Sequence, residues 1–292
     1  MNAHEFLAAR FEEHRTHLRA VAYRMLGSLS DADDAVQEAW MRISRTDTSG
    51  VENLGGWLTT IVGRISLNML RSRTQRREEP LDARVPDPII SSPEGLDPEH
   101  EVMLADSVGL ALLVVLDTLS PAERLAFVLH DLFSVPFDEI APIVGRTPAA
   151  ARQLASRARR RVQGTTPAPD ADPAAQREVV DAFLTAARGG DLEALLAVLD
   201  PDVVVRSDGG SLRPSGVVRG ALAVAEGAMT FARLAEFTRP ALVNGAAGAV
   251  AVSQGRPMSV AAFTVARGKV VALDILTDPE RLARLDLTVL DD

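Results

Sequence analysis

Apolar residues recur at helical spacing through the first quarter of the chain. Five apolar residues within Leu18–Leu26 follow the i, i+3, i+4, i+7, i+8 pattern of a helix with one buried face. A second apolar stripe follows Ser30 and runs through residues 31–43, with acidic residues in its first turn, where they suit the helix dipole. A third helix is expected to begin near Leu54, and the chain becomes strongly basic from Arg64 onward.

The same periodicity returns in residues 107–162, where turn residues interrupt it. After a long apolar helix, Ser120 and Glu123 are spaced as a capping box, in which each side chain satisfies the other residue's backbone N–H. A short helix is then predicted over Phe137–Val144, and a Gly-Arg turn separates it from a second helix over Pro148–Val162. This arrangement is typical of a helix-turn-helix motif.

The pattern changes in the last third of the chain. One helix is expected over Gln176–Arg188, and short runs rich in β-branched residues follow it, separated by Gly and Pro. These runs are residues 203–206, 241–243, 249–252, 259–266 and 270–275. We therefore expect an α+β domain with a curved antiparallel sheet, in which the last two runs form a hairpin.

Two proline-rich stretches divide the chain. Residues 78–101 hold five of the 17 prolines and eight acids, and residues 163–173 contain no apolar side chain larger than Ala. Such composition does not bury enough apolar surface to offset its ordering entropy, so we expect linkers at 78–103 and 163–174. The predicted domains are then 10–77, 104–162 and 175–290.

Composition restricts the class of protein. The chain has 292 residues, is 47% hydrophobic and 24% charged, and contains no Cys, which excludes disulfides and thiolate metal sites. No apolar run approaches the ~18–20 residues of a membrane span, and the first residues lack the apolar core of a signal peptide. The expected location is the cytoplasm, without a membrane partner. The net charge of −9 argues against general nucleic-acid affinity, so the distribution of basic residues is more informative than the total.

The helix over 148–162 has the clearest chemistry. It carries five Arg residues and no acid, while Ala151, Leu154, Ala155 and Ala158 keep one stripe apolar. Arg recognises guanine or phosphate and Gln recognises adenine, so this helix suits the major groove. The alternative is a solvated basic helix without a partner, and the register of turn, cap and apolar stripe disfavours it. The basic run 64–77 is weaker evidence, because cations commonly end helices.

These blocks resemble a known family. The segments LRAVAYRMLGSLSDADDAVQEAWMRI, GGWLTTIVGRISLNMLRSRTQRRE and LSPAERLAFVLHDLFSVPFDEIAPIVGRTPAAARQLASRARRRV resemble regions 2 and 4 of the extracytoplasmic-function (ECF) sigma factors of bacterial RNA polymerase. The last predicted domain, residues 175–290, resembles the SnoaL-like, NTF2-like domain fused to some of these factors, of the SigJ and SigI type. The resemblance implies a region 2 helical bundle, a region 4 helix-turn-helix and an α+β cone, which together direct polymerase to promoters.

The resemblance also implies roles for individual residues. The polymerase core would be contacted at its β′ clamp helices by region 2 and at its β flap. The implied polymerase-binding residues are Asp34, Gln37, Glu38 and Arg42. The −10 element would be contacted by Arg64, Asn68, Arg71 and Arg73, and the −35 element by Arg152, Gln153, Ser156, Arg157 and Arg160. A factor that is acidic overall would then depend on the polymerase for its affinity for promoter DNA.

The third domain has two alternative roles. The resemblance implies a regulatory domain that contacts the sigma regions, through a loop at Asp208, Gly209 and Gly210 and through Asp278 and Pro279. The linker lacks the family's tryptophan-proline motif. An enzyme is the alternative, but from residue 174 onward there is no His, Tyr, Cys or Trp. Asp202, Asp208 and Asp274 are the remaining candidate bases, and Asp208 is most simply a turn residue.

We therefore expect no catalytic residues, no metal and no cofactor. Two other functions stay open on the residues alone: a stand-alone DNA-binding regulator, which would not need residues 10–77 in this form, and an enzyme tethered to a DNA-binding module.

Overall fold

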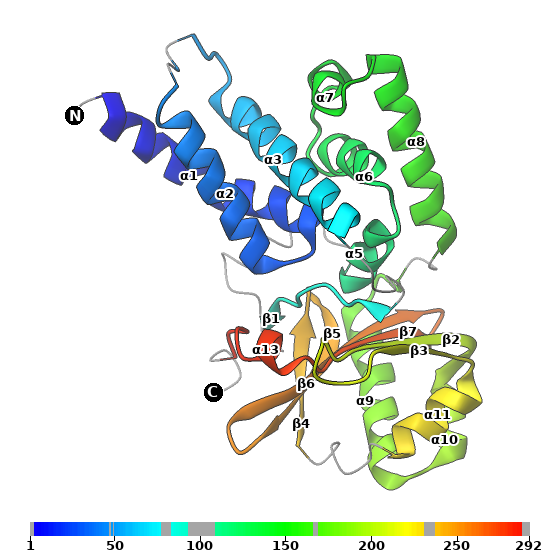
Figure 1. The fold of residues 1–292 in the computed structure, drawn as a ribbon. Helices are drawn as coiled ribbons and strands as arrows, with labels where there is room; N and C mark the ends of the chain where they lie inside the picture. Colours follow the sequence, from blue (N-terminus) through cyan, green and yellow to red (C-terminus); the bar gives the residue numbers. More distant parts are fainter. Residues whose placement is uncertain are drawn as a thin grey trace. The chain divides into compact units, whose positions relative to one another are not determined.

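The computed structural model describes residues 3–46, 48, 50–76, 83–92, 109–165, 169–230 and 237–287 (Figure 1). The chain forms two compact units. Unit 1 comprises Met1–Glu79, Glu101–Asp106 and Val115–Gly164, and unit 2 comprises Pro80–His100, Ser107–Val114 and Thr165–Asp292. Unit 1 therefore contains the first predicted helical domain and most of the second, whereas unit 2 contains the predicted α+β domain, residues 107–114 and most of the first predicted linker.

Three helices build the first half of unit 1: α1 (Ala3–Leu26), α2 (Leu29–Ile43) and α3 (Leu54–Arg76). Their apolar stripes face one another, and the side chains of Leu18, Met25 and Leu58 are fully buried between them. Helix α2 begins two residues before the start expected from the sequence, because Ser28 is its N-cap and accepts a hydrogen bond from the backbone N–H of Asp31.

Helix α5 (Gly109–Asp117) is shared between the units, and only its residues from Val115 onward belong to unit 1. The second half of unit 1 continues with α6 (Pro121–Phe127), a π-helical turn η2 (Val128–Leu132), α7 (Phe137–Val144) and α8 (Pro148–Thr165). The capping box at Ser120 and Glu123 is confirmed. Gly145 adopts a left-handed conformation, with φ of +68°, at the end of α7, and this allows the sharp turn into α8. The predicted helix-turn-helix is therefore present.

The two halves of unit 1 pack against each other. The Nε atom of Arg124 on α6 donates to the backbone oxygen of Arg24 on α1 at 3.0 Å, and the same buried guanidinium pairs with Asp117. Gly63 on α3 lies so close to η2 that a Cβ atom there would approach Leu129 to 3.0 Å. Helices α1 and α3 therefore pack against α6 and η2, which precede the helix-turn-helix.

Unit 2 is built on a seven-stranded sheet with the order β1-β4-β5-β6-β7-β2-β3. The strands are β1 (Ile90–Ser91), β2 (Leu199–Asp208), β3 (Gly216–Arg219), β4 (Thr238–Val243), β5 (Ala246–Ser253), β6 (Arg256–Ala266) and β7 (Lys269–Leu276). The predicted hairpin joins β6 to β7. The expectation of an antiparallel sheet is wrong for one pair, because β2 and β7 are parallel. These two strands are far apart in the chain, so no tight turn constrains their directions.

Helices α9 (Pro173–Gly189), α10 (Leu192–Val198) and α11 (Ala221–Thr230) contribute to the core of this unit, and a short helix, α13 (Pro279–Leu282), follows the sheet. Phe183 of α9 meets Phe263 of β6 edge to face, with ring centroids 5.3 Å apart. Leu195 and Val203 are fully buried in the same cluster. The covered face of the sheet and these helices form one hydrophobic core.

The first predicted linker has a structure that its composition did not suggest. Residues 83–92 pack on unit 2, and Val85, Ile89 and Ile90 are buried there. Ile90 and Ser91 form strand β1 at the edge of the sheet, paired with β4. The expectation that the first linker cannot bury enough apolar surface to offset its ordering entropy is therefore wrong for residues 83–92, which bury three apolar side chains and pair with a sheet edge.

Candidate polymerase and promoter interfaces

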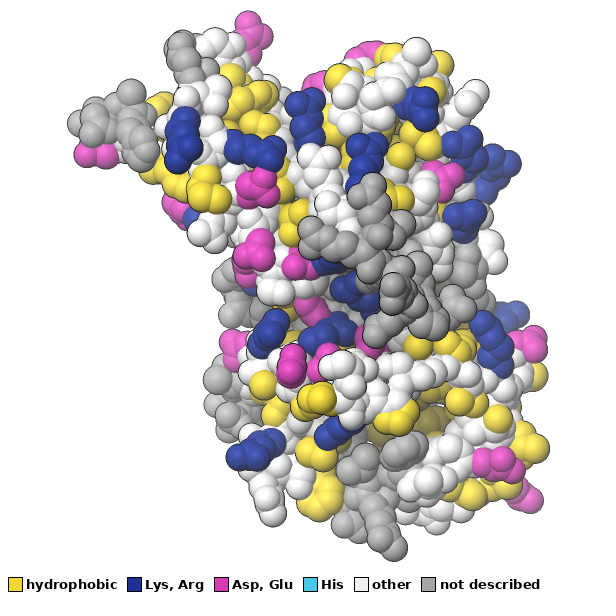
Figure 2. All heavy atoms as spheres, viewed as in Figure 1, with side chains coloured by type: hydrophobic (Ala, Val, Ile, Leu, Met, Phe, Trp, Pro, Cys, Tyr) yellow, Lys and Arg dark blue, Asp and Glu magenta, His cyan; other side chains and the backbone are white. Residues whose placement is uncertain are grey.

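The outer face of α8 presents the side chains that the sequence singled out. Ala151, Ala155 and Ala158 are buried against the preceding helices, which turns the opposite side of α8 to solvent. The predicted −35 residues Arg152, Gln153, Arg157 and Arg160 are exposed, and Ser156 is half-buried. Dark-blue Arg side chains gather along the side of the molecule on which α8 lies (Figure 2). The structure therefore brings these five residues together on one helix.

The arginines of α8 differ in how they are held. Arg157 donates from Nε to the carboxylate of Glu123 at 3.0 Å, and Arg159 donates to the carboxylate of Asp131. The guanidinium of Arg152 lies 5.3 Å from the centre of the Phe137 ring, a cation–π contact. Arg160 has no hydrogen-bond or ion-pair partner within the described residues.

The predicted −10 residues on α3 do not form one uniform surface. Arg64, Asn68 and Arg71 are exposed, and the described part of the chain offers no ion-pair partner to either arginine. Arg73 instead turns back on its own bundle, where it pairs with Asp31 of α2 and donates to the backbone oxygen of Leu26 at 3.0 Å. Arg73 is therefore held by its own bundle, unlike Arg64 and Arg71.

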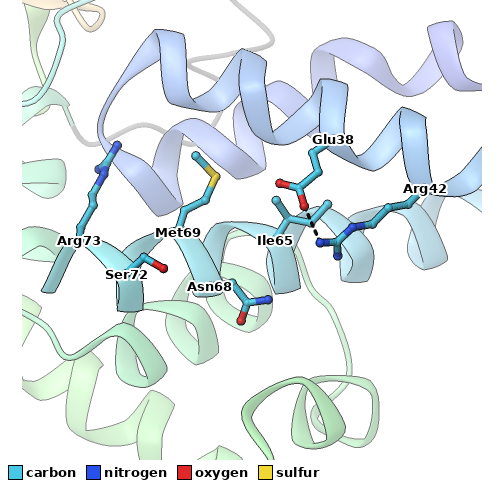
Figure 3. Close-up of a pocket in the computed structure, with 7 residues that line it drawn as sticks. All are labelled: Glu38, Arg42, Ile65, Asn68, Met69, Ser72 and Arg73. Carbon is cyan, nitrogen blue, oxygen red and sulfur yellow. Dashed lines mark hydrogen bonds and ion pairs between the residues drawn. The ribbon is translucent and has the colours of Figure 1, made fainter. Parts of the chain in front are cut away.

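The predicted polymerase-binding residues lie along one side of α2. Asp34, Gln37 and Arg42 are exposed, and Glu38 pairs with Arg42 (Figure 3). Met41 lies beside them and is 50% exposed, which the sequence reasoning missed. Its signal was available, since Met41 follows Glu38 by three positions and Gln37 by four and so shares their face.

A groove of about 390 Å³ runs between α2 and α3 (Figure 3). It is lined by Glu38, Arg42, Ile65, Asn68, Met69, Ser72 and Arg73. Residues assigned from the sequence to polymerase and residues assigned to DNA thus border the same depression, with apolar side chains between them.

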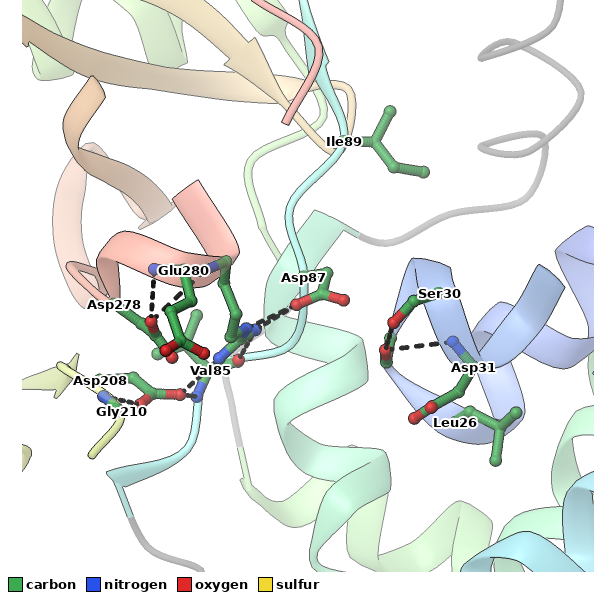
Figure 4. Close-up of polar contacts among 12 residues, drawn as sticks. Leu26, Ser30, Asp31, Val85, Asp87, Ile89, Asp208, Gly210, Asp278 and Glu280 are labelled. Carbon is green, nitrogen blue, oxygen red and sulfur yellow. Dashed lines mark hydrogen bonds and ion pairs between the residues drawn. The ribbon is translucent and has the colours of Figure 1, made fainter. Parts of the chain in front are cut away.

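The predicted regulatory loop lies at the docking point of residues 83–92 (Figure 4). The carboxylate of Asp208 accepts hydrogen bonds from the backbone N–H of Gly210 at 3.1 Å and from that of Val85 at 2.9 Å. Arg281 pairs with Asp208 at 2.8 Å and with Asp87 at 2.5 Å, and it donates to the backbone oxygen of Val85. Asp208 is therefore more than a turn residue.

The neighbouring residues shape this cluster. Gly210 has φ of +63°, and a Cβ atom there would collide with Asp278. Asp278 caps α13, with Pro279 in its first turn, and Gly209 is buried against Arg213. Helix α13 holds Arg281 in place, and the sequence reasoning missed this residue. Its signal was a basic residue two positions after the predicted Pro279.

The candidate bases of an enzyme have other surroundings. Asp274 is 1% exposed, and its burial raises its pKa although Arg206 pairs with it at 3.1 Å. Asp202 is exposed to solvent. Among the described residues, no three His, Asp or Glu side chains are grouped to hold a metal ion. None of the described helices is both long and apolar enough to cross a membrane.

Comparison with known proteins identifies the family to which this architecture belongs. Residues 10–76 match the model of Sigma-70 region 2, and residues 109–162 match that of Sigma-70 region 4. The chain is 40% identical over 287 residues to the ECF RNA polymerase sigma factor SigJ of Mycobacterium tuberculosis, covering 93% of this chain and 91% of that protein. The chain belongs to the ECF sigma factors.

One further relative and one solved structure match this ECF sigma factor over nearly its whole length, the C-terminal domain included. It is 35% identical over 288 residues to a probable ECF RNA polymerase sigma factor, SigI, of the same organism, covering 97% of each chain. The crystal structure of M. tuberculosis SigJ matches with a TM-score of 0.78 and 35% identity, covering 96% of this chain and 100% of that one. The predicted fold class of two helical sigma domains followed by an α+β domain is thereby confirmed.

Membership of the family also decides between the alternatives that the sequence left open. As an ECF sigma factor, the chain directs RNA polymerase in transcription initiation and binds polymerase core and promoter DNA. It is neither a stand-alone DNA-binding regulator nor an enzyme.

Proposed function

We propose that this sigma factor recognises the −35 element with α8, captures the −10 element with α3, and docks on the β′ clamp helices with α2, and that its C-terminal domain regulates these steps. The exposed face of α8 carries the first part of the proposal. An Arg fork and a Gln amide can each make two hydrogen bonds to a purine edge in the major groove, which requires side chains projecting from one face of a helix. Arg157 and Gln153 project in this way.

The exposed sides of α2 and α3 support the assignments in region 2. Asp34 and Gln37 give α2 an exposed polar rim, and Met41 adds an apolar side chain of the kind that anchors protein interfaces. Arg64 and Arg71 on α3 have the charge and freedom to follow the phosphates of a melted strand. The β flap would be contacted by region 4, as the family implies.

The docking of residues 83–92 supports the regulatory role of the C-terminal domain. These residues connect region 2 to region 4 in the chain, and Arg281 and Asp208 fasten them to the sheet. A domain that holds this connection constrains how the two sigma regions separate when they engage a promoter. Action on polymerase and DNA agrees with a cytoplasmic protein that needs neither a cofactor nor a membrane.

Run-off transcription with purified polymerase core tests the regulatory part. The promoter is selected from random DNA with the wild-type holoenzyme. Arg281→Gln removes the ion pairs to Asp87 and Asp208, and Arg284→Gln is the control, because Arg284 is exposed and has no ion-pair partner within the described residues. A higher yield from Arg281→Gln makes the domain an inhibitor, and a lower yield makes it an activator. An unchanged yield contradicts the proposal.

Charge reversal tests the polymerase face. We expect Asp34→Lys with Glu38→Lys to abolish co-purification with core, because both acids lie on the exposed side of α2. The matched control reverses Glu193 and Glu226, two exposed acids of unit 2. If the α2 variant still co-purifies normally with core, the assignment of α2 is wrong.

A further inference from the structure

Glu123 occupies an unusual position for an acidic residue in a DNA-binding domain. It lies on α6, yet its carboxylate reaches the basic helix α8, where it accepts a hydrogen bond from Nε of Arg157 at 3.0 Å. The second carboxylate oxygen lies 3.8 Å from a guanidinium nitrogen of Arg161. A carboxylate beside DNA repels phosphate, so its presence at this point calls for a compensating role.

The first turn of α6 fixes the orientation of Glu123. Its backbone N–H donates to the hydroxyl of Ser120, and its carboxylate accepts hydrogen bonds from the N–H and hydroxyl of Ser120. The side chain is only 14% exposed. Burial alone would raise the pKa of Glu123, but the hydrogen bonds from Ser120 and Arg157 outweigh it and hold the pKa below its ordinary value. Glu123 is therefore an ionised and immobile acceptor at neutral pH.

The contact uses only one edge of the Arg157 guanidinium. Glu123 takes the Nε hydrogen, and Arg157 remains 52% exposed, so the two terminal nitrogens stay available. These are the donors that grip the O6 and N7 atoms of guanine. An arginine whose side chain is already oriented loses less conformational entropy when it binds than a freely rotating one. Arg160, three positions along α8, has no such partner within the described residues.

We propose that Glu123 is a positioning residue for −35 recognition, which holds Arg157 in the orientation that reads a base edge. This inference rests on the proposed function, in which α8 enters the major groove. It makes a prediction opposite to simple charge repulsion. Removing the acid lowers selectivity for the −35 sequence even though it makes the DNA-binding surface more positive.

The variant Glu123→Gln separates the two effects. Gln serves as well as Glu at the third position of a capping box, so α6 keeps its cap while the ion pair to Arg157 is lost. The measurement is binding of full-length holoenzyme to a promoter selected from random DNA, and to the same promoter with its −35 element scrambled. We expect the ratio of the two affinities to fall about fivefold or more, the lower end of one bidentate base contact, while affinity for the scrambled promoter is unchanged or higher.

Two matched variants control for charge and for folding. Glu139→Gln makes the same charge change at an exposed position of α7 that has no ion pair to α8 among the described residues, and it should leave the ratio unchanged. In an Arg157→Ala background, Glu123→Gln should have no further effect on the ratio, because its target is gone.

The possible results lead to distinct conclusions. If Glu123→Gln raises both affinities equally, as a charge change alone would, Glu123 does not position Arg157. A fall in the ratio that persists in the Arg157→Ala background also overturns the inference, because the effect would then pass through another residue. If Arg157→Ala by itself leaves the ratio unchanged, the assignment of α8 to the −35 element fails instead.

Discussion

Helices α3 and α8 are the two long basic helices of unit 1, and neither contains an acidic residue. They present their arginines in opposite ways. On α8, Arg152, Arg157 and Arg159 each contact a side chain from an element that precedes the turn. On α3, Arg64 and Arg71 extend into solvent and have no ion-pair partner within the described residues.

This difference corresponds to the two forms of DNA that a promoter offers. Reading base edges in a duplex requires donors within a few tenths of an ångström of a fixed position, which favours arginines that are already held. Capturing a melted strand requires charge that follows a flexible backbone, and a freely rotating arginine meets that need. We therefore expect substitution of the held arginines of α8 to change which promoter is chosen, and substitution of the free arginines, on α3 or at Arg160 of α8, to change how tightly any promoter is held.

The largest effect should come from Arg157, the predicted −35 arginine that is held by an ion pair. We expect Arg157→Ala to weaken recognition of the −35 element by about 1–3 kcal/mol and to relax selectivity mainly at one base pair. Arg160→Ala should weaken binding to all promoters alike and reduce its salt dependence. Competitive binding of holoenzyme to a library of −35 variants measures both. If Arg160→Ala relaxes selectivity more than Arg157→Ala does, the distinction between held and free arginines is wrong.

A second effect concerns Arg73, the one predicted −10 residue that contacts its own bundle. Its ion pair with Asp31 and its hydrogen bond to Leu26 tie the end of α3 to the turn between α1 and α2. We expect Arg73→Ala to reduce the free energy of unfolding by about 1–2 kcal/mol, because a partly buried charged hydrogen bond is lost. Thermal unfolding measures this, and Arg71→Ala, at an exposed position, should leave the midpoint unchanged. Equal unfolding midpoints for wild type and Arg73→Ala would indicate that Arg73 does not stabilise the bundle and is available to contact DNA.

The free arginines of α3 should give a smaller effect that appears only as salt dependence. We expect Arg64→Ala with Arg71→Ala to reduce the slope of log affinity against log salt concentration by about 0.7 for each arginine, the value for single-stranded contacts. Open complexes on a fixed promoter, measured across a salt series, supply the slope. Arg284→Ala in unit 2 is the control. A change in promoter selectivity without a change in slope would contradict the role given to α3.

Local patterns in the sequence predicted much of this fold. The capping box at Ser120 and the Gly145 turn depend on residues within a few positions of one another, and both were predicted and confirmed. The β6–β7 hairpin succeeded for the same reason. The arginines of α8 could be placed on one exposed face because the buried alanines fix the register of the helix.

The contacts that the sequence did not predict all involve partners that are distant in the chain. Residues 83–92 have the composition of a linker, and only the edge of β4, some 150 residues further on, gives Ile90 a place to be buried. Asp208 has the sequence context of a turn residue, and only the fold brings Arg281 and Val85 beside it. The pairing of Arg73 with Asp31 depends on the packing of α2 against α3. Periodicity carries no information on any of these contacts.

The smallest expected effect concerns the contact between α1 and α3 at His17. His17 of α1 lies within hydrogen-bond distance of the Thr59 hydroxyl of α3, at 3.1 Å, and its ring meets Phe133 edge to face. Burial lowers the pKa of His17, and the charges of His14 and Arg24 add to this. In the unfolded chain a His has a pKa of about 6.5, so the unfolded chain binds a proton at His17 more readily than the folded chain does. The contribution of His17 to the free energy of unfolding is therefore fully present above that pH and is lost as the pH falls below it.

We expect unit 1 of the wild-type protein to lose about 1 kcal/mol or less of stability from this source between pH 7.5 and pH 5.5, a few degrees in Tm. His17→Gln keeps a hydrogen-bonding side chain beside Thr59 but does not titrate, so its Tm should change less over the same range. Identical pH dependence in the two proteins would show that the α1–α3 contact is insensitive to the charge of His17. The acid sensitivity of unit 1 would then have to come from its other histidines or from its carboxylates, and of the carboxylates Glu123, with its lowered pKa, titrates only at lower pH.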